Sequence, residues 1–292
     1  MLDFHYSTAT DGKGGSLLYP PFVTQQGLDE LAARFVVRND DVFIVTYPKA
    51  GTNWMRQIVH LLGHGGVQGE QTLRETVPLL EKEASQDNWA VIETTGARRY
   101  FMSHLPYGLM PRVQHSQARY ICVARNPKDC ATSYYYFMVS REDMRLQNEW
   151  DDFFDAYMQG QVPYGLWFDR TLEWWQASQQ NRNILFMHYE EMQIDLAACV
   201  EKIAHFIDIP LSPALRDSIV AQSRFDAMAT NTKTNWNLQP TRNGFPAKHL
   251  RKGKVGDWQH RFTPAQNARF DALYQQRMAG SGLHFAFDLE PA

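Results

Sequence analysis

The chain of 292 residues contains three cysteines and no long apolar run. Cys122, Cys130 and Cys199 are widely spaced and show no pairwise metal-ligand pattern, so the sequence offers neither a disulfide framework nor a zinc site. No segment approaches the roughly 18 apolar residues that a membrane helix needs, and residues 1–15 lack the apolar core of a signal peptide. We therefore expect a cytoplasmic protein that has no membrane partner.

An excess of charge of one sign is also lacking. Lysine and arginine number 29 against 32 aspartate and glutamate, which gives a formal net charge of −3. Such a chain has no overall field that attracts nucleic acid, so no nucleic-acid partner is expected and any anion must be bound locally. The length suits one large α/β domain. We expect a single domain over residues 1–292, with residues 1–18 as an irregular N-terminal segment.

Three short runs rich in β-branched residues predict buried parallel strands at residues 41–46, 119–124 and 183–187, each followed by a helical pattern. This alternation predicts an α/β fold with a central parallel sheet flanked by helices, whose ligands lie beyond the carboxyl ends of the strands. Further helices are expected at residues 150–159, 164–178, 196–207, 213–222 and 264–278. Residues 231–256 are rich in Asn, Thr, Gly, Pro and Lys and predict a mobile ligand-binding loop.

The segment TYPKAGTNW, residues 46–54, joins the first predicted strand to a helix. Backbone N–H groups and the positive helix end can bind a phosphate at such a turn, and Lys49 adds a charge. The segment is not a Walker A loop, in which the lysine follows the second glycine and precedes a magnesium-binding hydroxyl. That difference disfavours a P-loop kinase. The alternative is a tight connection with no ligand and a solvated Lys49.

Two further basic segments lie far apart in the sequence. Arg125 ends the second predicted strand, and Ser133 follows about two helical turns later, so a guanidinium and a hydroxyl could share one anion. RKGKVGDW, residues 251–258, combines three cations with two glycines that permit close backbone approach to a ligand. Each segment alone is also consistent with solvated surface. Together with Lys49 they suit a ligand that carries phosphates at opposite ends.

TYPKAGTNW, RNPKDCATSYYYF and RKGKVGDW, in this order, resemble the signature segments of the cytosolic sulfotransferases, and the similarity extends from about residue 42 to residue 282. SHLPYGLMP, YGLWFDRTLEWW, FMHYEEM and FTPAQNARFDALY are also similar to segments of that family. The resemblance implies a P-loop-like nucleotide-binding fold. It also implies transfer of a sulfuryl group from 3′-phosphoadenosine 5′-phosphosulfate (PAPS) to a hydroxyl of a small apolar or aromatic molecule, such as a phenol, steroid or alcohol. Adenosine 3′,5′-bisphosphate (PAP) is the implied co-product, and no metal is required.

The resemblance also implies where the donor binds. The 5′-phosphosulfate is expected on the loop formed by Lys49, Ala50, Gly51, Thr52 and Asn53. The 3′-phosphate is expected on Arg125, Ser133, Arg251, Lys252 and Gly253, and adenine among Trp54, Tyr189, Ser223 and Phe225. Two positions depart from the family pattern, because Ala50 stands where serine is expected and Ser223 where threonine is expected.

His104 matches the family's catalytic base, and the ordinary pKa of histidine suits that task. The chain has ten histidines, most of them expected to be structural or solvated. The resemblance implies that Lys49 stabilises the leaving phosphate oxygen and that Ser133 restrains Lys49 until acceptor is bound. Met102 stands where the family commonly has a lysine that helps to hold the transferred group. Two alternatives stay open. Another cation, such as Lys82 or Arg98, could compensate for the missing lysine, or the chain could be a nucleotide-binding protein with little catalysis.

The acceptor side is less well defined by the sequence. Phe22, Tyr136 and Phe137 are expected as walls of the acceptor pocket beside His104, with ordinary aromatic core as the alternative. No segment identifies the acceptor. The family's dimerisation pattern near the C-terminus, KxxxTVxxxE, is largely replaced here by Gln259-x3-Thr263-Pro264-x3-Ala268. We therefore expect a monomer, or a dimer that uses another surface.

Overall fold

A computed structural model describes residues 6–93, 98–111, 116–140, 149–235 and 250–289. One sheet of this part is fully parallel, with its strands in the order β4-β3-β5-β6. The strands are β3 (Val42–Thr46), β4 (Tyr100–Ser103), β5 (Arg119–Ala124) and β6 (Ile184–His188). The predicted strands β3, β5 and β6 and the predicted α/β fold are confirmed. Strand β4 was not predicted, because its four residues, YFMS, carry no β-branched residue.

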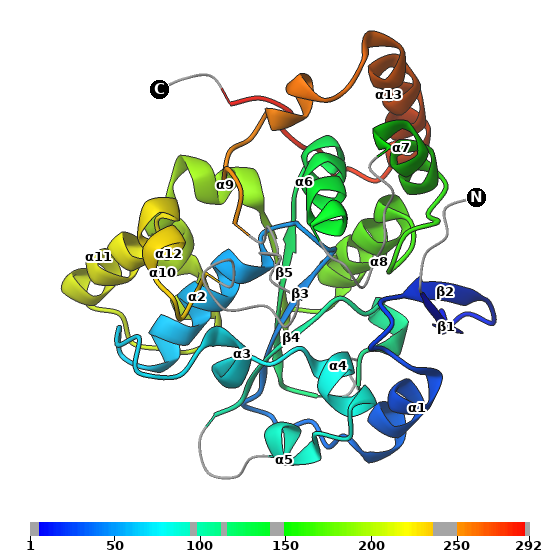
Figure 1. Ribbon diagram of the computed structural model, residues 1–292. Coiled ribbons are helices and arrows are strands. Elements are labelled where there is room, and N and C mark those ends of the chain that lie inside the picture. Colours follow the sequence, from blue (N-terminus) through cyan, green and yellow to red (C-terminus); the bar gives the residue numbers. More distant parts are fainter. Residues whose placement is uncertain (1–5, 94–97, 112–115, 141–148, 236–249, 290–292) are drawn as a thin grey trace.

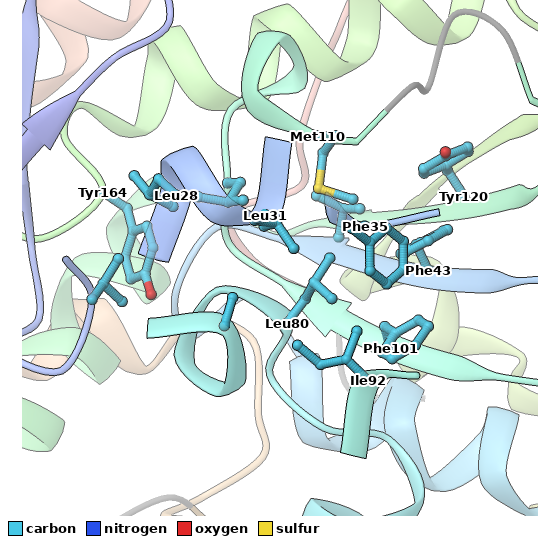
Figure 2. Packing of buried hydrophobic residues seen from close by; sticks show 14 of the residues in the cluster. Leu28, Leu31, Phe35, Phe43, Leu80, Ile92, Phe101, Met110, Tyr120 and Tyr164 are labelled. Carbon is cyan, nitrogen blue, oxygen red and sulfur yellow. The ribbon is translucent and has the colours of Figure 1, made fainter. Parts of the chain in front are cut away.

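Each face of the sheet is covered by its own helices (Figure 1). Alternate residues of β3 point to opposite faces, as the two-residue period of a strand requires. Val42 and Ile44 pack with α2 (Thr52–Gly63), α10 (Leu196–Phe206) and α11 (Pro213–Gln222). Phe43 packs on the other face with α1 (Gln25–Arg34), α4 (Leu80–Ser85) and α5 (Trp89–Ile92). Figure 2 shows Phe43 and Phe101 of the sheet beside Leu31 and Leu80 of this second layer.

A third apolar cluster is mainly aromatic and lies among α6 (Pro127–Val139), α7 (Trp150–Met158), α8 (Trp167–Gln180) and α13 (Pro264–Met278). Short elements complete the described structure: α3 (Leu73–Thr76), α9 (Tyr189–Ile194), α12 (Phe225–Thr230), η1 (Tyr107–Leu109) and η5 (Asp257–His260). Helix α8 begins three residues later than predicted. Tyr164 and Gly165 have φ values of 66° and 75°, which a right-handed helix cannot contain.

The N-terminal segment differs from the expectation. Residues 1–18 were expected to be irregular, but β1 (Ser7–Thr10) and β2 (Ser16–Tyr19) form an antiparallel hairpin. An isolated two-stranded hairpin is marginally stable in water, so such short strands depend on contacts with the rest of the fold. One contact is a hydrogen bond of 2.7 Å from the Tyr164 N–H to the Leu18 carbonyl. The hairpin thereby holds the loop that precedes α8.

The predicted ligand-binding loop at residues 231–256 is described only at its ends, and residues 236–249 lie outside the described residues. Residues 250–256 contain no helix or strand and lead into η5. In the described ranges, no helix combines the length and the apolar character needed to cross a membrane.

Candidate active site

A cavity of about 760 Å³ opens where the parallel strands end. The segment after each strand contributes to its lining, for example Lys49 after β3, His104 after β4, Arg125 after β5 and Tyr189 after β6. Four segments distant in sequence therefore meet at one edge of the sheet. The predicted site residues that line the cavity are Phe22, Lys49, Gly51, Thr52, Asn53, Trp54, His104, Arg125, Ser133, Phe137, Tyr189, Ser223, Phe225, Arg251, Lys252 and Gly253.

Ala50 and Tyr136 are not among the lining residues. Ala50 is fully buried, and its N–H donates to the Tyr47 carbonyl at 3.2 Å, closing the turn after β3. Tyr136 lies beneath the Arg251 guanidinium, whose carbon is 4.5 Å from the ring centroid. A helix turns about 100° per residue, so Tyr136 points to a different side of α6 from its neighbour Phe137. The expectation that the Tyr136 side chain forms a wall of the acceptor pocket is not supported by this geometry.

The turn between β3 and α2 is built around two left-handed residues. Lys49 has φ 70° and Gly51 has φ 107°. A Cβ on Gly51 would lie 2.8 Å from the Tyr189 ring, so both the conformation and the space require glycine. The hydroxyls of Thr46 and Thr52, 2.7 Å apart, tie the two ends of the turn together. The turn thus directs the positive end of α2 toward the cavity, where an anion is stabilised.

Lys49 lies close to α6. Its Nζ is 4.5 Å from the centroid of the Phe137 ring, a cation–π distance. Ser133 lines the cavity one helical turn before Phe137 on the same helix. The turn, Lys49 and the facing side of α6 therefore form a first candidate site for an anion.

A second group of cations lies at the segment before η5. Arg125 is 7% exposed; its Nη2 donates to the Lys254 carbonyl at 2.7 Å and is 3.4 Å from Asp129. Arg251 and Lys252 both pair with the carboxylate of Asp257. Among the described residues, Nε of Arg125 and Nε of Arg251 have no hydrogen-bond partner. Buried donors without partners are costly, so this group is suited to an anion that accepts from them.

An aromatic slot lies at the same cavity. The rings of Trp54 and Tyr189 meet at 5.3 Å and 69°, and the Arg125 guanidinium carbon lies 4.4 Å from the Tyr189 centroid. Gly253 has φ 64°, and a Cβ there would come within 2.3 Å of the Phe225 ring. The hydroxyl of Ser223 is buried and has no hydrogen-bond partner in the described part of the chain. Flat apolar faces with one hydroxyl are appropriate for a purine base.

His104 is held in one tautomer by the strand next to it. Its Nδ1 lies 2.8 Å from the Thr46 carbonyl oxygen, which only accepts hydrogen bonds. Nδ1 therefore carries the proton, and Nε2 carries the lone pair. Burial lowers the pKa of His104 to about 4; the bond to Thr46 opposes this shift, whereas the charges of Arg56 and Lys49 add to it. The imidazole is therefore neutral at physiological pH and able to accept a proton.

Sequence reasoning missed several residues of the site. Arg56 is 1% exposed, lines the cavity and donates to the carbonyls of Leu73 and Val77, each at 2.5 Å. Burial lowers its pKa to about 9. Tyr164 also lines the cavity, with its ring 5.1 Å from His104. Tyr164 begins the segment YGLWFDRTLEWW, for which the sequence indicated a family resemblance and a helix but no role in the site, and Arg56 had no signal beyond its helical position.

The positions of Arg98 and Lys82 distinguish the two suggested substitutes for the lysine that is missing at Met102. Met102 is 5% exposed and lines the cavity. Arg98 lies before β4, where it donates to the carbonyls of Asp40 at 2.7 Å and Ile207 at 2.5 Å. That position is at the opposite end of the strand, so the suggestion that Arg98 compensates is wrong. Lys82 does line the cavity, with its Nζ 3.1 Å from the Glu83 carboxylate.

This fold and site define a class of protein: an α/β enzyme with a P-loop-like anion site and a neutral histidine beside it. The comparisons agree, because the model of the sulfotransferase domain matches residues 39–282. The chain belongs to the sulfotransferase family.

Individual relatives match over most of their length. Sulfotransferase 1E1 of the guinea pig (Cavia porcellus) is 35% identical over 94% of this chain and 94% of its own. An amine sulfotransferase of the rabbit (Oryctolagus cuniculus) is 36% identical over 87% of this chain and 86% of its own. The crystal structure of mouse sulfotransferase SULT7A1 complexed with PAP superposes with a TM-score of 0.75, at 28% identity, covering 91% of this chain and 92% of that chain. The prediction of a sulfotransferase enzyme is confirmed, and the kinase and the non-catalytic alternatives are not supported.

Proposed function

We propose that this sulfotransferase moves the sulfuryl group of PAPS to a hydroxyl of a small apolar or aromatic molecule and releases PAP. The observation that carries the proposal is a single cavity in which two groups of cations, an aromatic slot and a neutral histidine occur together. A donor with phosphates at both ends of an adenosine matches this arrangement. The presence of PAP in the related mouse sulfotransferase supports the same donor.

In this proposal each part of the cavity binds one part of the donor. Lys49 and the backbone of the turn through Asn53 hold the 5′-phosphosulfate. Arg125, Ser133 and the segment Arg251, Lys252 and Gly253 hold the 3′-phosphate. The adenine lies among Trp54, Tyr189, Ser223 and Phe225, where the Ser223 hydroxyl gains a hydrogen-bond partner.

The chemical step follows from the placement of His104 and Lys49. The acceptor oxygen attacks sulfur while the bond from sulfur to the 5′-phosphate oxygen breaks, and the acceptor proton passes to Nε2 of His104. Negative charge develops on the leaving oxygen, as in phosphoryl transfer, and Lys49 with the N–H groups of the turn stabilises it. Ser133 restrains Lys49 before the acceptor binds. Lys82 supplies positive charge beside Met102.

The acceptor end of the cavity is mainly apolar. Phe22, Phe137 and Tyr164 line it together with Leu79 and Met102. These walls are suited to a phenol, a steroid or an aliphatic alcohol whose hydroxyl reaches His104. An amine nitrogen is the second acceptor to test, because one relative of similar identity is named an amine sulfotransferase.

We further propose that the enzyme is cytoplasmic and that its reaction requires no metal. Its three cysteines are buried free thiols, which suits a reducing compartment. We also propose a monomer, or a dimer that forms through another surface. The segment that replaces the family's dimerisation pattern serves here to begin a helix, through Thr263 and Pro264. They begin α13, where the Thr263 side chain accepts from the Gln266 N–H.

An acceptor screen by mass spectrometry, with PAPS as donor, tests the proposal on the wild type and on His104→Ala. The wild type is expected to give a sulfated product and PAP. His104→Ala is expected to lose at least about a hundredfold in turnover, because general base catalysis contributes roughly 10²–10⁴-fold. Its affinity for PAP should stay within about twofold, since the hydrogen bonds of His104 go to Thr46 and Glu81 rather than to the proposed nucleotide residues. Absence of product from every phenol, steroid, alcohol and amine would contradict the proposal.

A further inference from the structure

Glu81 is a buried carboxylate directly behind the wall of the cavity. It belongs to α4, and its exposed fraction is 0%. It is not a lining residue, although its neighbours Lys82 and Glu83 are. The preceding residue, Leu80, packs in the core between α4 and the sheet (Figure 2). The backbone that carries Glu81 is therefore firmly held.

One oxygen of Glu81 joins two residues that line the cavity. Oε1 accepts from the backbone N–H of His104 at 2.9 Å and from the hydroxyl of Tyr164 at 3.1 Å. The hydroxyl of Ser103 also bonds to this carboxyl. Oε2 has no hydrogen-bond partner among the residues that the structure describes. The carboxylate thus connects the segment after β4 with the loop before α8, which are 60 residues apart in sequence.

Tyr164 adopts a backbone conformation that needs such support. Its φ of 66° is in the left-handed region, which is unfavourable for a tyrosine. Residues of this kind persist where the surroundings fix them, and they are frequent at functional sites. Two polar contacts fix Tyr164, from its N–H to the Leu18 carbonyl at 2.7 Å and from its hydroxyl to Glu81. Its ring meets His104 at 5.1 Å and 63°, and Tyr19 at 5.5 Å.

We propose that Glu81 is a positioning residue that fixes His104 and Tyr164 relative to each other, and so sets the surface against which the acceptor hydroxyl must fit. Glu81 therefore governs acceptor binding and turnover but leaves nucleotide affinity unchanged. The inference rests on the proposed role of His104 as the base.

The electrostatics of Glu81 agree with this role. Burial raises its pKa to about 7, and the bonds from the His104 N–H, Ser103 and Tyr164 act against that rise. A carboxyl that served only to fill space would be replaced at no cost by an apolar side chain. Here the groups that donate to Glu81 belong to His104, the proposed base, and to Tyr164, a wall of the acceptor pocket. The loss of Glu81 is therefore expected to move both residues.

A double-mutant cycle tests the proposal with Glu81→Ala, Tyr164→Phe and the double variant. Glu81→Ala is expected to lower kcat/KM for the acceptor by about 30-fold, since a displacement near 1 Å can cost about a hundredfold. Tyr164→Phe is expected to lower it several-fold in the wild type and to have little further effect in Glu81→Ala. Glu81→Gln keeps an accepting oxygen and should recover activity to within about fivefold of the wild type. PAP affinity should change by less than about twofold in every variant.

The control is Ile203→Val in α10, a small truncation in the core on the other face of the sheet. It is expected to leave acceptor kinetics unchanged, which separates positioning from general destabilisation. Additive effects in the cycle, unchanged acceptor kinetics in Glu81→Ala, or an equal loss of PAP affinity would overturn the proposal.

A spectroscopic readout covers the cases in which Glu81→Ala does not fold or no acceptor is found. The backbone amide resonance of His104 should move in Glu81→Gln, because its acceptor changes from a carboxylate to an amide. An unmoved resonance would overturn the inference. An inactive wild type with a shifted resonance would instead show that the proposed function fails while the contact stands.

Discussion

At the scale of the residue, two features of the fold keep His104 neutral and fix which ring nitrogen can accept a proton. The Thr46 carbonyl fixes its proton on Nδ1, and burial lowers its pKa to about 4. The hydrogen bond and the burial together give a neutral imidazole whose Nε2 carries the lone pair, before any ligand binds. The same shift has a consequence for stability that does not depend on any substrate.

Stability should fall between pH 6.5 and pH 4 in part because of His104. In the unfolded chain histidine binds a proton below about pH 6.5, whereas the folded His104 stays neutral down to about pH 4. The unfolded state therefore binds more protons in this window, and stability rises with pH. His104→Gln is expected to remove roughly 2 kcal/mol of this pH dependence, less than the full shift implies because His104 lines an open cavity. Urea unfolding of both proteins at pH 4, 5, 6 and 7 measures it, and parallel curves would contradict the assigned environment.

Lys82 lines the same cavity as Met102 and is the remaining candidate to replace the family's lysine. Lys82→Met is expected to lower kcat about tenfold or more, because one pre-organised donor to the transferred group would be lost. PAP affinity should be unchanged. Met102→Lys in the same variant should restore part of the rate, since it places a cation on the adjacent β4. Single-turnover kinetics with PAPS distinguish the variants, and a Lys82→Met enzyme with full activity would eliminate this role.

At the scale of the element, the proposed binding of the 3′-phosphate by the segment before η5 depends on the shape of its backbone as well as on its charges. Gly253 lies against Phe225, and its φ of 64° is in the left-handed region. Gly253→Ala is therefore expected to displace the Phe225 ring and the adjacent Arg251 and Lys252. We expect PAP affinity to fall about tenfold or more, the size of the effect when one or two charge-assisted hydrogen bonds are weakened.

Gly280→Ala is the matched control for this prediction. Gly280 has a similar φ of 74°, but a Cβ there would meet nothing within 4 Å. This variant should show the cost of the backbone conformation alone, about 1 kcal/mol of stability, with unchanged PAP affinity. Calorimetric titration of both variants decides the matter. Equal PAP affinities for the two variants would show that Gly253 has no special place in the site.

The elements that could be predicted well from the sequence are those whose pattern lies within the element, such as an apolar run or a helix cap. Strands β3 and β5 are apolar runs, and α13 begins with Thr263 and Pro264 at its cap. Strands β4, β1 and β2 have four residues each, and they depend on contacts with segments distant in sequence. Glu81 and Tyr164 were missed for the same reason, because their roles exist only once α4, β4 and the loop before α8 meet. The residues proposed to bind the nucleotide could be predicted because the family's motifs carry most of them in short contiguous segments.

At the scale of the whole molecule, three separate apolar clusters fix one edge of the sheet. The clusters lie on the two sheet faces and among α6, α7, α8 and α13, so α2, α4 and α6, which border the cavity, are each anchored in a different cluster. The molecule has a net charge of −3, yet the cavity gathers Lys49, Arg125, Arg251 and Lys252. The cations proposed to bind an anion are thus concentrated at this edge, whereas the molecule as a whole carries no positive charge that would attract one.

Calorimetric titration with PAP, compared with adenosine 5′-monophosphate, tests most directly whether two separate groups of cations bind one nucleotide. The account predicts one PAP per chain and an affinity for adenosine 5′-monophosphate at least about tenfold weaker, because that ligand lacks the 3′-phosphate that the second group binds. Lack of measurable PAP binding, or equal affinity for the two nucleotides, would contradict it.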